Sequence, residues 1–359
     1  MIMGNLIDYL EWRGDVLFST SQFNIIDAMI LCEVAYFPLD GIVPFDFNED
    51  ISFDDMCKQV IKVEELSVHD DRDVELATAL IEAERFDKIR LTGFVNDVNV
   101  EKEKQFSAVT YKLENGNIFV AFRGTDKSLI GWKENMDLAY NEVVPAQKTA
   151  ANYLNDVLKF FKKKTIVGGH SKGGNLAVYS SAFCDEKLFK YIEHVYNFDG
   201  PGFNHVVIED PGFEKAAPKI TTIVPQSSLI GMLLEHKEKI NVIESTGTNG
   251  FSQHPVFTWN VKRNDFVYMD GITLAGQYTN ENISDWIQRM SFEEKEQFIS
   301  ALFKLLDTNK NVEEVFAAKN IIPLIKGYKD MSDEEKKNIW SAIGDLKDTV
   351  IDNIKERLI

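Results

Sequence analysis

The stretch TIVGGHSKGGNLA, residues 165–177, decides the fold of this chain. It begins with a short apolar run that is typical of a buried strand and ends with small residues that are typical of a closely packed helix. Between them, Gly169, Ser171 and Gly173 form the pattern G-x-S-x-G. Glycines are needed there because side chains flanking so sharp a turn would collide with neighbouring backbone. The stretch therefore predicts a strand–turn–helix unit that exposes the Ser171 hydroxyl at the edge of a sheet.

Further strands are predicted on both sides of this unit. Residues 118–122, IFVAF, suit a central strand buried on both faces, and ENGN at 114–117 suits a tight turn before it. Other strands are expected at residues 90–95, 106–111, 194–198, 220–224, 240–243 and 257–261. Helices are expected between several of them, at 149–161 and 175–183. This alternation predicts a mostly parallel α/β sheet with right-handed crossovers.

Both ends of the chain are predicted to be helical. Apolar residues follow helical spacing over much of 5–36 and again at 74–86, and strand signals end near residue 283. Two capping boxes then open Leu- and Lys-rich helices: Ser291 with Glu294, and Ser332 with Glu335. We therefore predict an α/β-hydrolase domain at residues 1–284, including the N-terminal helices, and a C-terminal helical appendage at residues 285–359.

Charge and cysteine content narrow the partners and cofactors. Asp and Glu outnumber Lys and Arg by 57 to 39, and the net charge of −18 repels phosphate backbones, so nucleic acid is not expected as a partner. Cys32, Cys57 and Cys184 include no C-x-x-C pair, which fits a reducing compartment. The sequence contains no phosphate-loop, zinc-protease or dinucleotide pattern, so no cofactor or metal is expected.

Nothing in the sequence predicts a membrane segment. The longest relevant apolar run, LIGMLL at 229–234, is far shorter than the roughly 18 residues that a membrane-spanning helix needs. Residues 1–10 lack the basic start and apolar core of a secretory signal. We therefore expect a cytoplasmic protein without integral membrane association, and no pattern predicts its oligomeric state.

Three segments resemble known lipases. Residues 167–177 are similar to the nucleophile segment of the class 3 (fungal-type) lipases, GHSLGG followed by small residues. VAFRGTD at 120–126, with Trp132 and Asp137-Leu138 downstream, is similar to their F-R-G-[ST] strand and its D-W-x-x-D-L sequel. DYLEWRG at 8–14 resembles the N-terminus of the bacterial lipase-like group known as Mbeg1-like or DUF2974. The resemblance covers most of residues 5–270 and implies a serine hydrolase of the α/β-hydrolase superfamily.

The same resemblance implies an oxyanion hole. Thr125 matches the position that supplies one donor in class 3 lipases, and the backbone N–H of Lys172 would be the second. Such donors stabilise the negative oxygen that forms during acyl transfer. Thr125 has the alternative role of capping the next turn.

A serine nucleophile needs a base, and in this fold class the histidine follows the nucleophile and the acid in the chain. Four histidines follow Ser171. His254 is favoured because it lies in a loop after the last long strands and can reach back to the serine. The other three lie inside a strand, after a Gly-Pro-Gly loop and at the end of an apolar helix: His194, His205 and His236. A surface histidine is the alternative for His254.

The acid is where the sequence departs from the class 3 pattern. Those lipases carry an aspartate after the next strand, whereas IVPQSS at 223–228 has no carboxylate. Asp199, directly after the preceding strand, resembles the acid of pancreatic-type lipases, and one helix and one strand fit between it and Ser171. Its alternative role is to start the Gly-Pro-Gly turn. Weaker candidates for the acid are Asp210, Glu235 and Asp265.

The apolar residues 227–234 follow the expected acid region. Leu229, Met232 and Leu233 are candidates for a lid or an acyl-binding wall, with core packing as the alternative. The leading hypothesis is thus cleavage of a small-molecule or lipid ester, or a thioester, through an acyl-enzyme. Two alternatives stay open: an inactive hydrolase-like scaffold that binds a lipid, peptide or protein, and a peptidase or amidase using the same residues.

Overall fold

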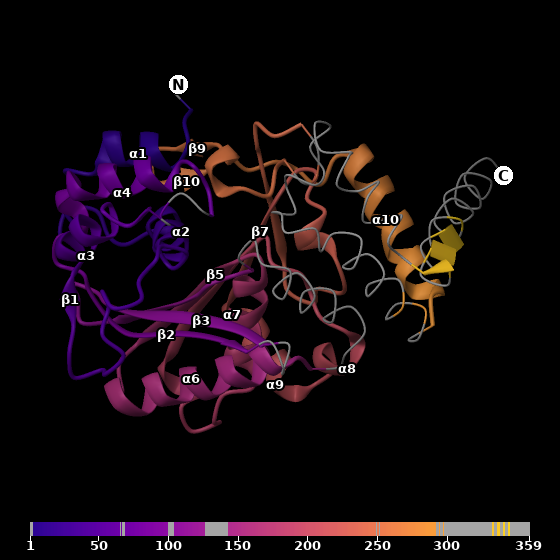
Figure 1. The fold of residues 1–359 in the computed structure, drawn as a ribbon, viewed down its shortest axis with the longest axis horizontal. Helices are drawn as coiled ribbons and strands as arrows, with labels where there is room; N and C mark the ends of the chain where they lie inside the picture. The colour runs from indigo at the N-terminus through magenta and orange to yellow at the C-terminus, as the bar shows by residue number, and fades with distance from the viewer. Residues whose placement is uncertain are drawn as a thin grey trace.

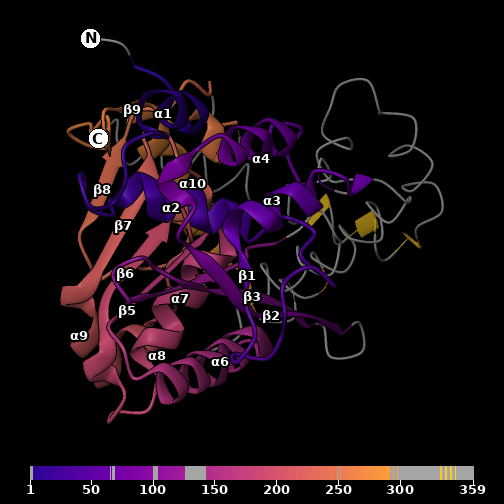
Figure 2. The same ribbon diagram turned by 90° about the vertical axis from the view of Figure 1, so that its left-hand side faces the viewer.

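The computed structural model describes residues 3–64, 66, 69–99, 104–125, 143–248, 250 and 252–291, with a few single residues between 294 and 344. An eight-stranded sheet crosses the molecule, and its strands lie side by side in chain order (Figures 1 and 2). Its strands are β1 Ile51–Ser52, β2 Arg90–Asn99, β3 Lys104–Lys112, β4 Ile118–Phe122, β5 Thr165–His170, β6 Ile192–Phe198, β7 Ile220–Pro225 and β8 Ile240–Ile243.

The sheet combines an antiparallel part with a parallel part. Strands β1 to β4 pair antiparallel, and β4 to β8 pair parallel, with α-helices in the connections between β4 and β7. The turn between β3 and β4 uses Gly116 at φ 81°, in the left-handed region where glycine carries no steric penalty. The predicted α/β fold with a mostly parallel central sheet and flanking helices is therefore confirmed.

Helices cover both faces of the sheet (Figure 2). The N-terminal layer consists of α1 Leu6–Arg13, α2 Ile25–Val34, α3 Phe53–Val60, α4 Asp73–Ile81 and the 3-10 turn η2 Glu84–Phe86. The opposite layer contains α6 Pro145–Phe161, α7 Lys172–Ala182, η3 Phe189–Tyr191, α8 His205–Ile208, α9 Pro211–Ala216 and η4 Ala217–Lys219. Helices α1 and α2 each begin with an Asn–Asp capping box, at Asn5 with Asp8 and at Asn24 with Asp27.

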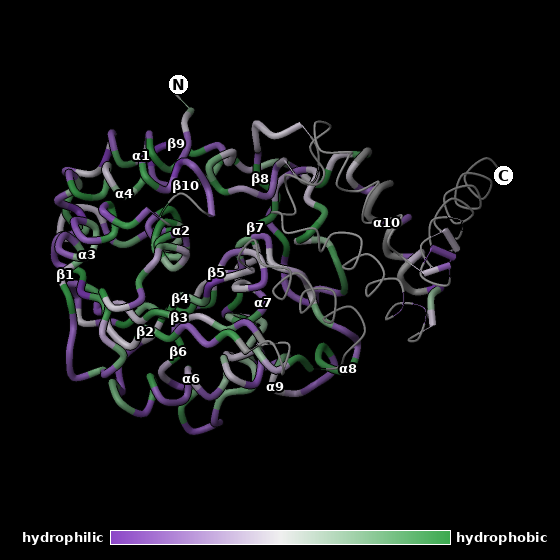
Figure 3. The backbone as a smooth tube through the Cα atoms, in the orientation of Figure 1, coloured by the Kyte–Doolittle hydropathy of each residue, from purple (hydrophilic) through white to green (hydrophobic). Residues whose placement is uncertain are grey.

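Strand β4 separates two hydrophobic cores. Phe119 and Ala121 pack into the core under the N-terminal layer, and Ile118, Val120 and Phe122 pack into the core under α6 and α7. Side chains alternate between the faces of a strand, so a fully apolar run such as IFVAF serves both cores. Hydrophobic residues accordingly follow α2 and the central strands in Figure 3.

The region after β8 differs from the sequence prediction. The expected strand at 257–261 is instead a 3-10 turn, η6 Val256–Thr258, followed by the short pair β9 Val261–Lys262 and β10 Asp265–Phe266. The expected apolar helix before His236 is only the turn η5 Ile230–Met232. Apolar content misled both predictions, because these side chains fill the core from irregular backbone. The short edge strand β1 was not predicted.

The chain beyond the sheet continues as α10 Leu274–Arg289, capped by the Thr273 side chain. The helix crosses the predicted domain boundary at residue 284, and the division into two domains stays a prediction. Ser291 and Glu294 exchange the two hydrogen bonds of a capping box, as predicted, whereas Glu335 lies outside the described residues. Among the helices of the described part, none is long and apolar enough to cross a bilayer.

Candidate active site

Ser171 occupies a strained turn between β5 and α7. Its backbone has φ 58° and ψ −133°, a conformation that residues with a Cβ atom rarely adopt and that concentrates at functional sites. The turn needs its flanking glycines: a Cβ atom on Gly169 would lie 2.2 Å from the backbone of Gly173, and one on Gly173 would lie 2.1 Å from the Phe122 carbonyl. The predicted strand–turn–helix unit is therefore present, with the serine at its apex. Ser171 is only 7% exposed, so it lies just beneath the surface. The sequence had predicted that it would be exposed.

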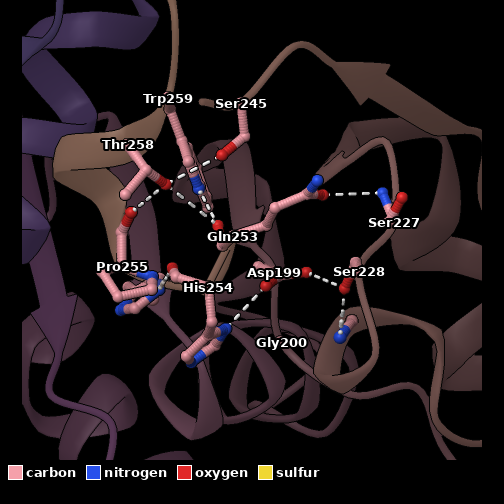
Figure 4. A network of polar contacts seen from close by, with 12 residues as sticks. Asp199, Gly200, Ser227, Ser228, Ser245, Gln253, His254, Pro255, Thr258 and Trp259 are labelled. Atoms are coloured by element: carbon pink, nitrogen blue, oxygen red, sulfur yellow. Dashed lines mark hydrogen bonds and ion pairs between the residues drawn. The ribbon is translucent and has the colours of Figure 1, made fainter. Parts of the chain in front are cut away.

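Asp199 lies at the same edge of the sheet as Ser171. The parallel register pairs His170 with Phe198, and the Ser171 N–H donates to the Phe198 carbonyl at 2.9 Å, so the chain reaches Asp199 immediately beyond. Asp199 also has a positive φ of 50° and is fully buried. Its Oδ2 accepts a hydrogen bond from Nδ1 of His254 at 2.6 Å, and its Oδ1 accepts one from the Ser228 hydroxyl at 2.5 Å (Figure 4).

His254 has the tautomer that a general base needs. A carboxylate only accepts hydrogen bonds, so Nδ1 carries a proton toward Asp199, which leaves Nε2 as the ring nitrogen that can accept a proton from a nucleophile. The loop that carries His254 is fixed by Gln253, whose carbonyl accepts from the Trp259 indole at 2.7 Å and whose side chain accepts from the Ser227 N–H at 2.8 Å (Figure 4). The side chain of His254 remains 22% exposed, so a substrate can approach it.

The predicted base and the predicted nucleophile are linked through His170, without a direct hydrogen bond between them. The ring of His170, the residue before Ser171, lies 4.6 Å from the ring of His254 between centroids. Within the described part of the chain, no hydrogen bond joins the Ser171 hydroxyl to His254. In hydrolases without substrate this bond is often long and tightens in the complex. The arrangement is that of an assembled Asp–His pair beside a serine held in a strained turn.

The two predicted oxyanion positions flank the serine. Gly124 precedes Thr125 at the end of β4, and a Cβ atom on Gly124 would lie 3.1 Å from that of Ser171. Lys172 is the first residue of α7, so its amide belongs to the helix N-terminus, where partial positive charge favours an anion. The Lys172 ammonium points elsewhere and donates to the Gln105 carbonyl on β3 at 2.8 Å.

The alternative acids and histidines have other partners. Asp210 caps α9, Asp265 accepts from the Tyr268 hydroxyl, and Glu235 lies near the exposed His205. His194 is bonded to Thr221 and His236 to Glu238. Among the described residues, none of these three acids is hydrogen-bonded to His254.

The three residues of the candidate acyl-binding wall lie in three different environments. Leu229 is buried, whereas Leu233 is half-buried and its carbonyl accepts from the Gly202 N–H at 2.8 Å. Met232 lines an open hollow of about 430 Å³ beside β8, together with Tyr268 and Met269. A role for these residues in binding an acyl chain stays a prediction.

Ser228 is a site residue that sequence reasoning missed. Its hydroxyl is fully buried, donates to Asp199 and accepts from the Gly231 N–H at 3.0 Å. Gly231 has no room for a side chain, since a Cβ atom there would lie 2.2 Å from Oδ1 of Asp199. The available signal was its position: Ser228 lies in the segment after β7 where class 3 lipases carry their acid.

Ser228→Ala is expected to lower kcat/KM for an ester about tenfold and to cost about 1–3 kcal/mol in the free energy of unfolding. The variant removes a charge-assisted hydrogen bond to a buried carboxylate and leaves the Gly231 amide without its acceptor. Ester hydrolysis and thermal melts measure the two effects. Ser227→Ala is the matched control because Ser227 bonds Thr273 rather than the acid, and equal losses in both variants would contradict the role given to Ser228.

A buried acidic pair lies behind the site, in the N-terminal layer. Glu33 and Asp73 are both buried, and burial followed by the charge of Glu33 raises the pKa of Asp73 to about 9. Folded Asp73 therefore keeps a proton that the unfolded chain releases near pH 4. Between these values the folded state binds more protons, so this group makes the free energy of unfolding decrease as pH rises from about 4 to about 9.

Asp73→Asn is expected to reduce that pH dependence and to raise the melting temperature at pH 8 relative to the wild type. Asparagine keeps an oxygen that accepts from the Asp70 N–H and replaces the other carboxyl oxygen with a neutral NH2 group, which has no proton to lose in this pH range. Melting curves at pH 5 and pH 8 measure the difference. An unchanged slope of stability against pH would show that Asp73 is ionised in the folded protein.

A parallel sheet that carries a strained serine after β5 and an aspartate after β6 has the architecture of a lipase-type α/β-hydrolase fold. The chain belongs to the Mbeg1-like family, whose model matches residues 80–304, more than half of its length. The predicted relation to this family is confirmed.

Three solved lipases are similar to part of the chain. The propeptide complex of Rhizomucor miehei lipase has a TM-score of 0.35 and 15% identity, covering 50% of this chain and 68% of that chain. Lipase II from Rhizopus niveus has a TM-score of 0.35 and 14% identity, covering 49% and 83%. M37 lipase has a TM-score of 0.33 and 15% identity, covering 45% and 63%. A comparison with curated proteins found no match.

Proposed function

We propose that this protein is a serine hydrolase that cleaves an ester or thioester through an acyl-enzyme on Ser171. The observation that supports this most is the 2.6 Å hydrogen bond between Asp199 and His254, which are 55 residues apart in the chain. A fully buried carboxylate is costly unless it is paired and hydrogen-bonded. Here its partner is a partly exposed imidazole beside a strained serine, which is the constellation that acyl transfer requires.

In the proposed reaction, Ser171 Oγ attacks the substrate carbonyl carbon while His254 Nε2 accepts the hydroxyl proton. Asp199 holds the ring and stabilises the imidazolium that forms. The backbone amides of Thr125 and Lys172 donate to the negative oxygen. His254 then returns the proton to the departing alcohol or thiol, and a water molecule, deprotonated by the same nitrogen, hydrolyses the acyl-enzyme and releases Ser171.

The proposed substrate is a small-molecule or lipid ester with an apolar acyl group. Leu229, Met232 and Leu233, in the segment after β7, would line its path. In the same segment Ser228 donates to Asp199, and Gly231 lies so close that a Cβ atom on it would meet the carboxylate, which supports placing the acyl group on this side of the site. The cytoplasmic location stays a prediction from the unpaired cysteines.

A fluorophosphonate probe tests the proposal because it reacts with activated serines and forms a stable mimic of the tetrahedral intermediate. We expect the wild-type protein to be labelled, the modified peptide to contain Ser171, and prior incubation with p-nitrophenyl esters of increasing acyl length to slow the labelling. Parallel assays with amide substrates separate an esterase from an amidase. A folded wild-type protein that resists labelling would favour the inactive scaffold instead.

A further inference from the structure

Tyr36 connects the N-terminal layer to the candidate active site. It lies two residues beyond the end of α2, is buried, and lies outside the segment that matches the family model. Its hydroxyl accepts the Gly124 N–H at 3.0 Å, donates to the His170 carbonyl at 3.1 Å and lies 3.4 Å from Nδ1 of His170. One hydroxyl therefore joins the ends of β4 and β5.

Each group that the hydroxyl contacts is one residue away from a proposed participant in the reaction. Gly124 precedes Thr125, and His170 precedes Ser171. The last parallel pair between β4 and β5 is Phe122 with Gly169, so the sheet itself does not fix the spacing of the chains beyond that point. The Tyr36 hydroxyl fixes the spacing of the two chain segments beyond this pair, at the point where the oxyanion donor must face the nucleophile.

The ring of His170 extends this connection to the base. Burial, with smaller contributions from His254 and His69, holds the pKa of His170 well below its ordinary value, so the ring is neutral. Its Nε2 faces the His254 carbonyl at 3.1 Å and must donate, which leaves Nδ1 as an acceptor on the side of Tyr36. Tyr36 thus contacts a ring that holds the backbone of His254.

The side chain of Tyr36 is itself held in place by a stacking neighbour. The ring of His69 stacks on it with centroids 3.8 Å apart, and Nε2 of His69 lies 3.3 Å from the buried Glu33 carboxylate. Burial and then Glu33 raise the pKa of the Tyr36 hydroxyl well above its ordinary value. The hydroxyl therefore stays protonated in the working range and serves as a fixed donor and acceptor rather than as an acid or a base.

We propose that Tyr36 is a positioning residue that sets the distance between the oxyanion donor at Thr125 and the nucleophile Ser171. The N-terminal helical layer then contributes to the geometry of the active site and does not only pack on the sheet. This inference rests on the proposed serine hydrolase function.

Tyr36→Phe tests the inference because it keeps the ring and its stacking on His69 but removes the hydroxyl. We expect the second-order rate constant for fluorophosphonate labelling, and kcat for an ester, to fall about 10- to 100-fold, because a small misplacement of reacting groups costs rates of this order. KM should change less than about threefold, since the hydrogen bonds of this hydroxyl matter for the transition state rather than for ground-state binding.

Tyr111→Phe is the matched control. It removes another buried hydroxyl, which donates to the Leu31 carbonyl of the same layer at 2.8 Å and does not touch the site. Its rate per folded molecule, with folding measured by circular dichroism, should stay within about twofold of the wild type. Equal rate losses in the two variants would overturn the positioning role in favour of a structural one.

The outcomes separate this inference from the function on which it rests. If wild-type protein is labelled at Ser171 and Tyr36→Phe is labelled equally fast, the positioning role is wrong and the hydrolase proposal stands. If folded wild-type protein is not labelled, the hydrolase proposal itself fails. Should Tyr36→Phe not fold, 3-fluorotyrosine at position 36 keeps the hydroxyl but weakens it as an acceptor, and an unchanged labelling rate would then overturn the positioning role.

Discussion

Ser171→Ala is expected to lower kcat for ester hydrolysis by about 10⁴–10⁶ and to abolish fluorophosphonate labelling. Removal of a nucleophile that acts together with its base usually eliminates nearly all catalysis beyond what the oxyanion donors provide. The fold should survive, because alanine meets the same positive φ as serine and Ser171 Oγ makes no hydrogen bond to His254. Hydrolysis of a chromogenic ester, with thermal melts of both proteins, measures the effect.

Ser180→Ala provides the control for this first variant. Ser180 is buried on α7 and, within the described part of the chain, its hydroxyl donates to the Ala177 carbonyl of its own helix, so its loss should leave hydrolysis within about twofold of the wild type. A Ser171→Ala protein that retains wild-type turnover would place the chemistry elsewhere in the molecule.

Asp199→Asn is expected to lower kcat by about 10⁴ with little change in the fold. The amide can donate to Nδ1 of His254, which moves the ring proton to Nε2 and removes the lone pair that must accept the serine proton. The imidazolium also loses its anionic partner. The measurement is the pH profile of kcat/KM, in which the variant should recover part of its rate at high pH, where hydroxide replaces the base.

Asp210→Asn is the matched control for the second variant. It makes the same change from carboxylate to amide at the cap of α9, where asparagine caps as well as aspartate. We expect wild-type activity. If Asp199→Asn also retained full activity, Asp199 would be the turn residue that its sequence context equally suits, and another group would have to orient His254.

The parts that the sequence predicted are those with a local signal. Thirteen consecutive residues predict the strand before Ser171 and the helix after it. Chain order then reduced the candidates for the base and for the acid to a few residues. The structure brings two of these, His254 and Asp199, together. The roles of Thr125 and Lys172 remain predictions. Both residues would donate through their backbone N–H groups, so the type of side chain gives no signal for this role.

The parts that escaped prediction depend on tertiary contacts. Tyr36 approaches His170 across 134 residues of chain, and Ser228 reaches Asp199 from the segment after β7, 29 residues away. Neither belongs to a motif. The strand expected at 257–261 was wrong for a related reason. Phe257 and Trp259 are apolar because they fill the core, but Phe257 lies in a 3-10 turn and Trp259 forms only an isolated bridge with Ser245.

The contact between Ser228 and Asp199 limits how many carboxylates can stand beside His254. In the class 3 lipases that the sequence resembles, the acid follows the strand that corresponds to β7, whereas here the loop after β7 supplies the Ser228 hydroxyl to Asp199, which follows β6. Two carboxylates 2.5 Å apart cannot both be ionised, so an acid at position 228 would share a proton with Asp199. The pair would then offer His254 a single negative charge, as Asp199 does with a neutral hydroxyl beside it.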